Sequence, residues 1–219
     1  MFKHLVSCSL LIVLVACKSS GGDGGTPTTP TPTNRAPVIA SVTVNPTFGI
    51  ADLQVFNFVA TASDPDGDPV SYNWDLAGNA RTGSTAQVVF VSPGGNGRGT
   101  VTVSDGRGLT ASSGVDFIVG SAAGNWTVTV GQLAGSTFSL AQNTSGFVTG
   151  TFFLPGIGSG NTDPAQPGQI LVNGNLTMRV KIGAFTDFTM TGTMATTGRS
   201  ISGTLQGSGF TGQPFTMTK

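Results

Sequence analysis

From Ala36 onward the chain is dominated by short segments in which apolar and polar residues alternate. In Val38-Ile39-Ala40-Ser41-Val42-Thr43-Val44 and in Val55–Ala62, every second residue is apolar or small. This period of two predicts strands with one buried face, and turn-forming stretches such as Ser63–Pro69 separate them. The strands expected in this part are residues 38–44, 55–62, 70–75, 87–91, 99–104 and 113–119. Several short strands at close spacing predict a β-sandwich over residues 36–120.

A second pattern of strands runs from Gly124 to Lys219. Phe147–Phe152, Phe188–Met194 and Ile201–Leu205 share an apolar-polar-Gly-Thr-apolar form. A glycine inside a strand predicts a bulge or a bend where a curved sheet closes. We expect seven or eight strands in up-and-down order that form a small β-barrel, with one long loop at residues 155–168. The predicted fold class is therefore all-β: a sandwich followed by a barrel.

Composition narrows the classes of function. Only 9% of the residues are charged, the formal net charge is zero, and glycine occurs 33 times. The low charge leaves no basic patch that could neutralise phosphates, so nucleic acid is not an expected partner. Glutamate is absent and no segment has a 3.6-residue period, which agrees with the prediction of strands without helices.

The first residues carry a different signal. Lys3 precedes an apolar run, Leu5 to Val15, that is shorter than the ~20 residues needed to cross a bilayer, as in a secretory leader. Leu14-Val15-Ala16-Cys17 resembles a bacterial lipobox. The resemblance implies cleavage after residue 16, acylation of Cys17 and a lipid anchor in a membrane. The alternative is an ordinary signal peptide in which Cys17 has no special role.

The resemblance also implies a location and an arrangement of parts. Lys18 follows the cysteine where an aspartate would retain such a lipoprotein in the inner membrane, so we expect a bacterial cell-envelope protein at the outer membrane. Residues 18–35 are rich in Gly, Ser, Thr and Pro, and eight of them, 26–33, favour a polyproline II spacer of roughly 25 Å. The expected parts are a signal peptide at 1–16, the lipidated Cys17 with its linker at 17–35, a sandwich at 36–120 and a barrel at 124–219.

Two segments of the first β-region resemble the signature of a PKD domain. They are Ser63–Asp75 and Gly99–Gly106, and the resemblance covers about residues 36–120. It implies an immunoglobulin-like sandwich in which Trp74 is a core residue and Tyr72 lies on the same strand face. The sequence departs from the family after Asp75, where Leu-Ala-Gly-Asn replaces the usual Phe-Gly-Asp-Gly. A role that depends on that acidic turn is therefore not carried over.

Asp64, Asp66 and Asp68 are the candidate ligands of a metal. Alternating carboxylates on a tight turn can converge on Ca²⁺ together with backbone carbonyls. An EF-hand is excluded, because Pro69 occupies the place that requires glycine and Asp75 would have to replace a bidentate glutamate. The alternative is that the aspartates form the turn by accepting backbone hydrogen bonds and stay solvated. Asp105-Gly106 is interpreted as a hairpin turn.

The start of the second β-region is similar to the first three strands of avidin-like barrels. The segments are Gly124-Asn125-Trp126, Gly135–Leu140 and Gly146–Phe152, which cover less than half of the region. Avidin-like barrels grip biotin with further tryptophans, whereas this region has Trp126 alone. The resemblance therefore implies the barrel topology but no ligand, with Trp126 as a plug at the barrel base. We expect the interior to be filled by phenylalanines or to hold one small ligand, and the phenylalanines are Phe138, Phe147, Phe152, Phe188 and Phe210.

The chemistry that remains after cleavage argues against catalysis. His4 is the only histidine and Cys8 the only other cysteine, and both precede the cleavage point. A serine triad would lack its base, paired acids would have to come from one turn, and a Ser-Lys dyad would need Lys181 or Lys219. We expect no enzyme and no cofactor apart from calcium. The leading hypothesis is a membrane-anchored adhesion or binding module for protein or glycan. The alternatives are a carrier of a small apolar ligand in the barrel and a purely structural envelope protein.

Overall fold

The structure is a computed structural model that describes residues 32–183 and 186–219. All regular elements in this part are β-strands, as predicted, and it contains no helix long and apolar enough to cross a membrane. Cys17, the predicted leader and most of the linker lie outside the described residues. The strands before residue 121 are β1 (Val38–Asn45), β2 (Phe48–Ile50), β3 (Val55–Ser63), β4 (Ser71–Leu76), β5 (Asn79–Thr82), β6 (Thr85–Val89), β7 (Gly95–Ser104) and β8 (Thr110–Gly120). The later strands are β9 (Gly124–Val130), β10 (Thr137–Gln142), β11 (Phe147–Leu154), β12 (Gly158–Asn161), β13 (Gly168–Ile170), β14 (Asn175–Val180), β15 (Phe188–Met194), β16 (Ser200–Gly207) and β17 (Phe210–Thr218).

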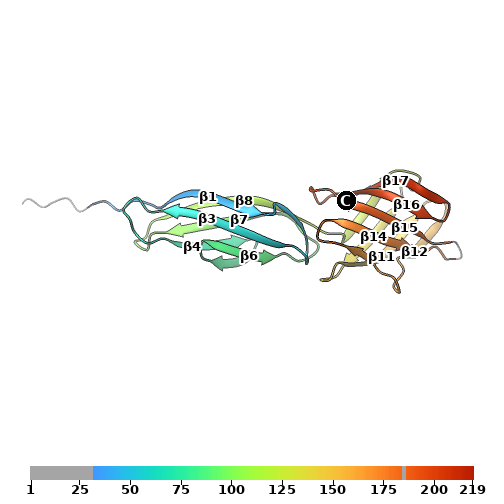
Figure 1. Cartoon of the computed structure of the whole chain (residues 1–219), viewed down its shortest axis with the longest axis horizontal. Helices are drawn as coiled ribbons and strands as arrows, with labels where there is room; N and C mark the ends of the chain where they lie inside the picture. The colour runs from blue at the N-terminus through green and yellow to red at the C-terminus, as the bar shows by residue number, and fades with distance from the viewer. Residues whose placement is uncertain (1–31, 184–185) are drawn as a thin grey trace, which may run out of the picture. The chain divides into compact units, whose positions relative to one another are not determined.

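Strands β1 to β8 form a two-sheet sandwich (Figure 1). One sheet has the order β1-β3-β6 and the other the order β2-β8-β7-β4-β5. Alternation places Phe56 and Phe58 of β3 inward, where both rings lie 5.4 Å from the ring of Phe117 on the opposite sheet. The sheets are therefore held together by interlocked aromatic rings, whose burial is a main source of stability in a described region that contains no cysteine.

The core roles predicted for β4 are confirmed. Trp74 is 3% exposed, and its Nε1 donates a hydrogen bond of 2.9 Å to the carbonyl oxygen of Gly83. Tyr72 packs against the same core, and its hydroxyl accepts a hydrogen bond of 3.2 Å from the amide of Ala62. Each large ring thus buries its apolar part and keeps a partner for its polar atom.

The sandwich has strands that alternation did not reveal. Strands β2 and β5 have three and four residues, too few to show a period. Strand β7 begins at Gly95, four residues before the predicted start. The earlier start was missed because Gly97 lies in this part of the strand. Glycine is needed there beneath an aromatic ring, since an added Cβ would lie 2.3 Å from the ring of Phe117.

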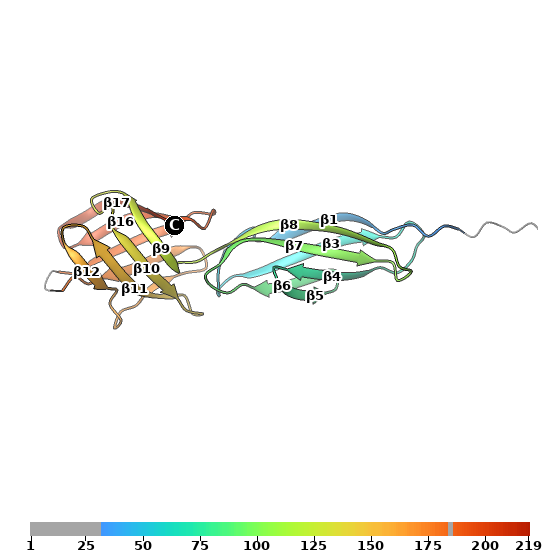
Figure 2. The same ribbon diagram turned by 180° about the vertical axis from the view of Figure 1, so that it is seen from behind.

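Strands β9 to β17 form one antiparallel sheet that closes on itself (Figure 2). From β9 to β12 and from β13 to β17, each strand pairs with the next in the chain, and β17 returns to β9. Strands β12 and β13 both pair with β11 on the same side, so the barrel has eight strand positions. The up-and-down barrel predicted from the sequence is confirmed.

The barrel interior is packed with side chains. Trp126, Phe138, Phe188 and Phe215 are each at most 1% exposed, and aliphatic side chains fill the space between them. The methionines of the barrel are part of this packing: Met178, Met190, Met194 and Met217. An eight-stranded barrel has room for side chains or for one small ligand, and in this chain side chains occupy the interior. The expectation was wrong for Phe147, which occupies an outward position of β11 and is 43% exposed.

The glycines of the repeated motif have a role other than the predicted bulges. Gly150, Gly192 and Gly203 lie in regular register with their partners. An added Cβ would lie 2.1 Å from the carbonyl oxygen of Ser139 at Gly150 and would clash with the Thr191 carbonyl at Gly203. These inward-facing glycines let neighbouring strands approach closely where the sheet bends. The prediction allowed either a bulge or a bend at these glycines, and the bend is what the structure has.

The predicted loop at residues 155–168 contains a strand. Strand β12 extends the β11 hairpin, and Thr162 forms an isolated bridge to Val180 of β14. The segment Gly-Ser-Gly-Asn has no apolar alternation, but Gly160 fits beneath the ring of Phe152, where an added Cβ would lie 2.6 Å away. Backbone pairing and small residues, which carry little periodic signal, fill this position of the barrel.

Candidate metal centre

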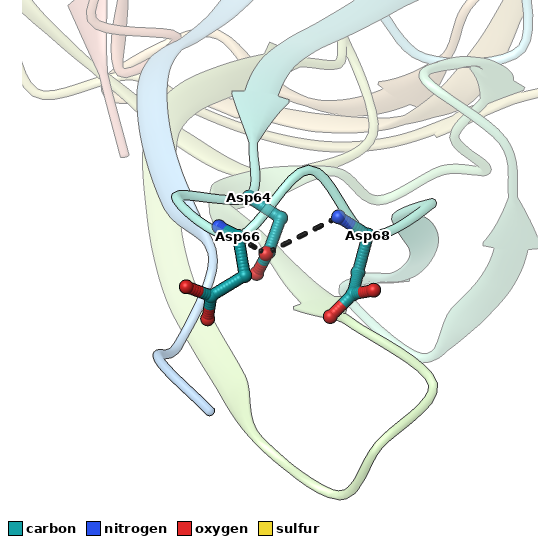
Figure 3. Close-up of side chains that lie close together, drawn as sticks. All are labelled: Asp64, Asp66 and Asp68. Carbon is teal, nitrogen blue, oxygen red and sulfur yellow. Dashed lines mark hydrogen bonds between the residues drawn. The ribbon is translucent and has the colours of Figure 1, made fainter. Parts of the chain in front are cut away.

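The turn between β3 and β4 brings the three predicted aspartates together. One carboxylate oxygen from each of Asp64, Asp66 and Asp68 lies within 4.8 Å of the others. Figure 3 shows the three carboxylates pointing to the same side of the turn. The proximity expected from the sequence is therefore present.

Asp64 also forms the turn itself. Its Oδ1 accepts hydrogen bonds from the amides of Asp66, at 2.8 Å, and Asp68, at 3.3 Å (Figure 3). Gly67 has a φ of 83°, a left-handed conformation that favours glycine. The turn-forming interpretation thus holds for one oxygen of Asp64 and leaves its second oxygen for another role.

Two arginines from distant segments neutralise the other aspartates. The Nε atom of Arg35 lies 2.8 Å from Oδ1 of Asp66, and its backbone amide donates to Oδ2 at 2.7 Å. Arg107 Nη2 lies 2.9 Å from Oδ1 of Asp68. The hydrogen bonds from Arg35 hold the pKa of Asp66 below its ordinary value.

Asn34 and Asp105 extend the cluster to the turn between β7 and β8. Nδ2 of Asn34 donates a hydrogen bond of 2.7 Å to Oδ2 of Asp105, which is 3% exposed. Oδ1 of Asp105 accepts from the amides of Arg107, at 2.7 Å, and Leu109, at 3.1 Å. Burial would raise the pKa of Asp105, but the hydrogen bonds from Asn34 and the turn amides outweigh it and lower that pKa.

Three oxygens at this end of the sandwich are buried without a hydrogen-bond partner: Asn34 Oδ1, Asp64 Oδ2 and Asp68 Oδ2. Buried oxygens of this kind are costly unless something binds them. The cluster contains the four carboxylates of Asp64, Asp66, Asp68 and Asp105. The guanidinium groups of Arg35 and Arg107 pair with Asp66 and Asp68, which leaves a formal charge of minus two. Carboxylate and amide oxygens with this surplus charge fit a Ca²⁺ ion.

The sequence analysis did not connect Asn34 or the two arginines with this cluster, and it interpreted Asp105 as part of a hairpin turn. Asn34 and Asp105 are separated by 71 positions, and only the fold brings them together. A local signal existed for Asp105, whose Asp-Gly sequence predicts a turn, and the turn is present, with a φ of 75° at Gly106. Asn34 and Arg35 had no such signal, because they are the last residues of a low-complexity linker.

Lys219, one of the two lysines considered for catalysis, is engaged elsewhere. Nζ of Lys219 donates hydrogen bonds to the carbonyl oxygens of Ser121, at 2.8 Å, and Ala123, at 3.0 Å, and lies 4.7 Å from the centre of the Trp126 ring. Desolvation by burial is the main cause that lowers the pKa of Lys219. These contacts are structural, with carbonyls where a dyad would need a serine hydroxyl. Trp126 itself is fully buried, and its Nε1 donates a hydrogen bond of 2.8 Å to the carbonyl oxygen of Ala122.

Comparisons with known proteins find similar domains for the first β-region. Residues 34–118 match the family model described as Bacterial Ig domain, in agreement with the immunoglobulin-like class predicted for this part. The PKD1 domain of Vibrio anguillarum Epp is similar to this chain at 24% identity, with a TM-score of 0.33, and the alignment covers 40% of this chain and 96% of that one.

A carbohydrate-binding module of the β-sandwich superfamily is similar at 17% identity, with a TM-score of 0.38, over 79% of this chain and 61% of that one. No curated protein matches the chain. TM-scores of this size transfer no ligand or activity to this chain, and the family match ends before the barrel begins.

Proposed function

We propose that this chain is a non-catalytic lipoprotein of the bacterial cell envelope that acts as a binding or adhesion module. In this proposal Cys17 carries the acyl anchor in the outer membrane, residues 18–35 form the tether, and the sandwich (36–120) and barrel (124–219) are displayed beyond it. The match to a bacterial immunoglobulin domain supports a surface or extracellular role, and the family that it names is not an enzyme family.

The observation that carries the proposal is the way the tether ends. Asn34 binds the β7–β8 turn through Asp105, and Arg35 binds the β3–β4 turn through Asp66. The last linker residues are thus fastened to two turns at one end of the sandwich by charge-assisted hydrogen bonds. A fixed attachment point of this kind suits a module that must be held at a defined distance from its anchor.

Calcium strengthens this attachment in the proposal. Asn34, Asp64 and Asp68 each have a buried oxygen free to bind the ion, while Asp66 is paired with Arg35 and contributes mainly through its charge. A Ca²⁺ ion held by these oxygens would tie Asn34 to the β3–β4 turn and neutralise the surplus charge. The ion has a structural role here and supplies no reaction chemistry.

The alternative roles have less support. An apolar-ligand carrier needs free space inside the barrel, whereas the interior side chains such as Trp126, Met178 and Phe188 are buried against one another. A purely structural envelope protein would explain the packing too, and it predicts that the purified chain retains no protein or glycan partner.

The test of the calcium proposal is thermal unfolding of the purified chain with Ca²⁺ or with a chelator. A ligand at a hundred times its dissociation constant stabilises the native state by about 2.7 kcal/mol, which corresponds to a rise of several degrees in Tm. We expect this rise in the unmodified chain and its loss in Asp64→Asn and Asp68→Asn.

Asp116→Asn is the matched control, because it removes a carboxylate that is 75% exposed and lies outside the cluster. It should keep the full response to Ca²⁺. An unmodified chain whose Tm does not change with Ca²⁺ would leave Asp64 as a turn former only.

A further inference from the structure

The outer face of strands β9 to β12 carries polar side chains in aligned rows. Ser139 on β10 is opposite Asn125 on β9 and Thr151 on β11, and Thr151 is opposite Asn161 on β12. The next row contains Thr137 opposite Phe153. Because these residues occupy the outward positions of their strands, all of them are exposed.

These rows line an open groove of about 530 Å³. This volume is in the range of small-ligand sites, about 300–1,000 Å³. All the residues that line the groove are uncharged, and the ring of Phe153, 52% exposed, is the large apolar group that stands free in it. The groove thus combines one aromatic face with hydroxyl and amide groups and carries no formal charge.

The polar groups of this face are free to bind a ligand. On the opposite part of the barrel, outward side chains bond to each other: Thr193 to Asn175 at 2.9 Å, and Ser202 to Thr216 at 2.9 Å. Within the described part of the chain, the side chains of Asn125, Ser139, Thr151 and Asn161 make no such internal hydrogen bond. The β9–β12 face therefore keeps its donors and acceptors available.

We propose that this groove binds a neutral oligosaccharide. The inference rests on the proposed binding function and names its partner class. Sugar hydroxyls both donate and accept hydrogen bonds, as do the hydroxyls of Ser139 and Thr151, and the amides of Asn125 and Asn161 offer both kinds of group. Phe153 presents an aromatic face to the apolar C–H face of a sugar ring.

Other occupants fit the groove less well. An acidic glycan or a phosphate would find no cation among the lining residues. A protein interface of standard size places several buried aromatic or arginine anchors at its centre, and here Phe153 is the single exposed ring. A neutral polyhydroxyl ligand matches the polarity and the absence of charge.

The experiment measures binding of neutral hexasaccharides of glucose, xylose, mannose and N-acetylglucosamine to the full lipidated chain. The chain is held in a detergent without sugar head groups, and an oligogalacturonate of the same length is the acidic comparison. We expect at least one neutral hexasaccharide to bind, with little change in affinity between low and high salt, because no ion pairs form. Phe153→Ala should weaken binding by about tenfold or more, and Asn125→Ala and Asn161→Ala should weaken it as well.

Phe147→Ala is the matched control. Phe147 is a second exposed phenylalanine on the outer face of β11, 43% exposed, and it does not line the groove. It should leave binding unchanged, and unaltered circular dichroism of both phenylalanine variants shows that the fold is intact.

Equal losses in Phe153→Ala and Phe147→Ala, binding of the oligogalacturonate alone, or no binding of any neutral hexasaccharide would overturn the inference. A protein partner that Phe153→Ala releases would also overturn it, but would leave the proposed binding function standing.

Discussion

At the scale of single residues, Asp105 links the tether to the sandwich and should make the stability of this end depend on pH. The pKa of Asp105 is lowered in the folded state, since the hydrogen bonds from Asn34 and the turn amides outweigh the effect of burial. The unfolded chain has an aspartate pKa near 3.9, so it takes up the proton first as the pH falls. The stabilisation is therefore complete above about pH 5 and is lost as the pH drops through the folded-state pKa.

We expect Asp105→Asn to lower the urea midpoint at pH 7, because the new amide places a donor opposite the donor of Asn34. The difference from the unmodified chain should shrink between pH 5 and pH 3. Urea unfolding at several pH values measures this, with Asp116→Asn as an exposed control. A difference that stays constant with pH would contradict the proposed titration.

Single residues could be predicted from the sequence where they belong to a short motif. Trp74 and the three aspartates were identified because each lies within one short motif. The partners of those aspartates were not, because Arg35 and Arg107 reach Asp66 and Asp68 across the fold and leave no local pattern. The likeness of the strands around Trp126 to avidin-like barrels stays a prediction, as do calcium binding and acylation at Cys17.

At the scale of elements, strand length decided which parts could be predicted. Longer strands such as β3 and β15 show their alternation and were predicted from it. Short strands such as β2, β5 and β12 exist because a longer neighbour offers unpaired backbone groups. Their own side chains are too few to show an alternation from which a strand could be predicted.

The bridge at the end of β12 gives a prediction at this scale. Oγ1 of Thr162, which is 2% exposed, accepts a hydrogen bond of 2.9 Å from the amide of Gly150 on β11. Thr162→Val keeps the shape but leaves that amide without this acceptor, at a cost of about 1–3 kcal/mol. Denaturant unfolding should show the loss. Thr149→Val, an exposed change on β11, should have almost no effect; equal effects would mean that the bond contributes little.

At the scale of the whole molecule, the anchor gives a prediction of its own. In cells that process lipoproteins, we expect the chain to incorporate labelled palmitate and to fractionate with membranes. Cys17→Ser removes the acylated thiol and should release the protein, because each buried methylene contributes about 0.8 kcal/mol to membrane attachment.

The leader offers a matched control for this experiment. Cys8→Ser changes the other cysteine of the chain, which the proposed cleavage removes, and should leave labelling and fractionation unchanged. Labelling that persists in Cys17→Ser would disprove acylation at this residue.

The packing of the barrel has a consequence for chemical durability outside the cell. Methionine is the readily oxidised side chain of the described region, and Met178, Met190, Met194 and Met217 are at most 4% exposed. A peroxide can reach these thioethers only when the barrel opens, so the rate of sulfoxide formation follows the rate or the population of opening. Each sulfoxide would put a polar group into the interior and hinder reclosure. The working lifetime of this protein in an oxidising environment is therefore set by how often its sheet separates.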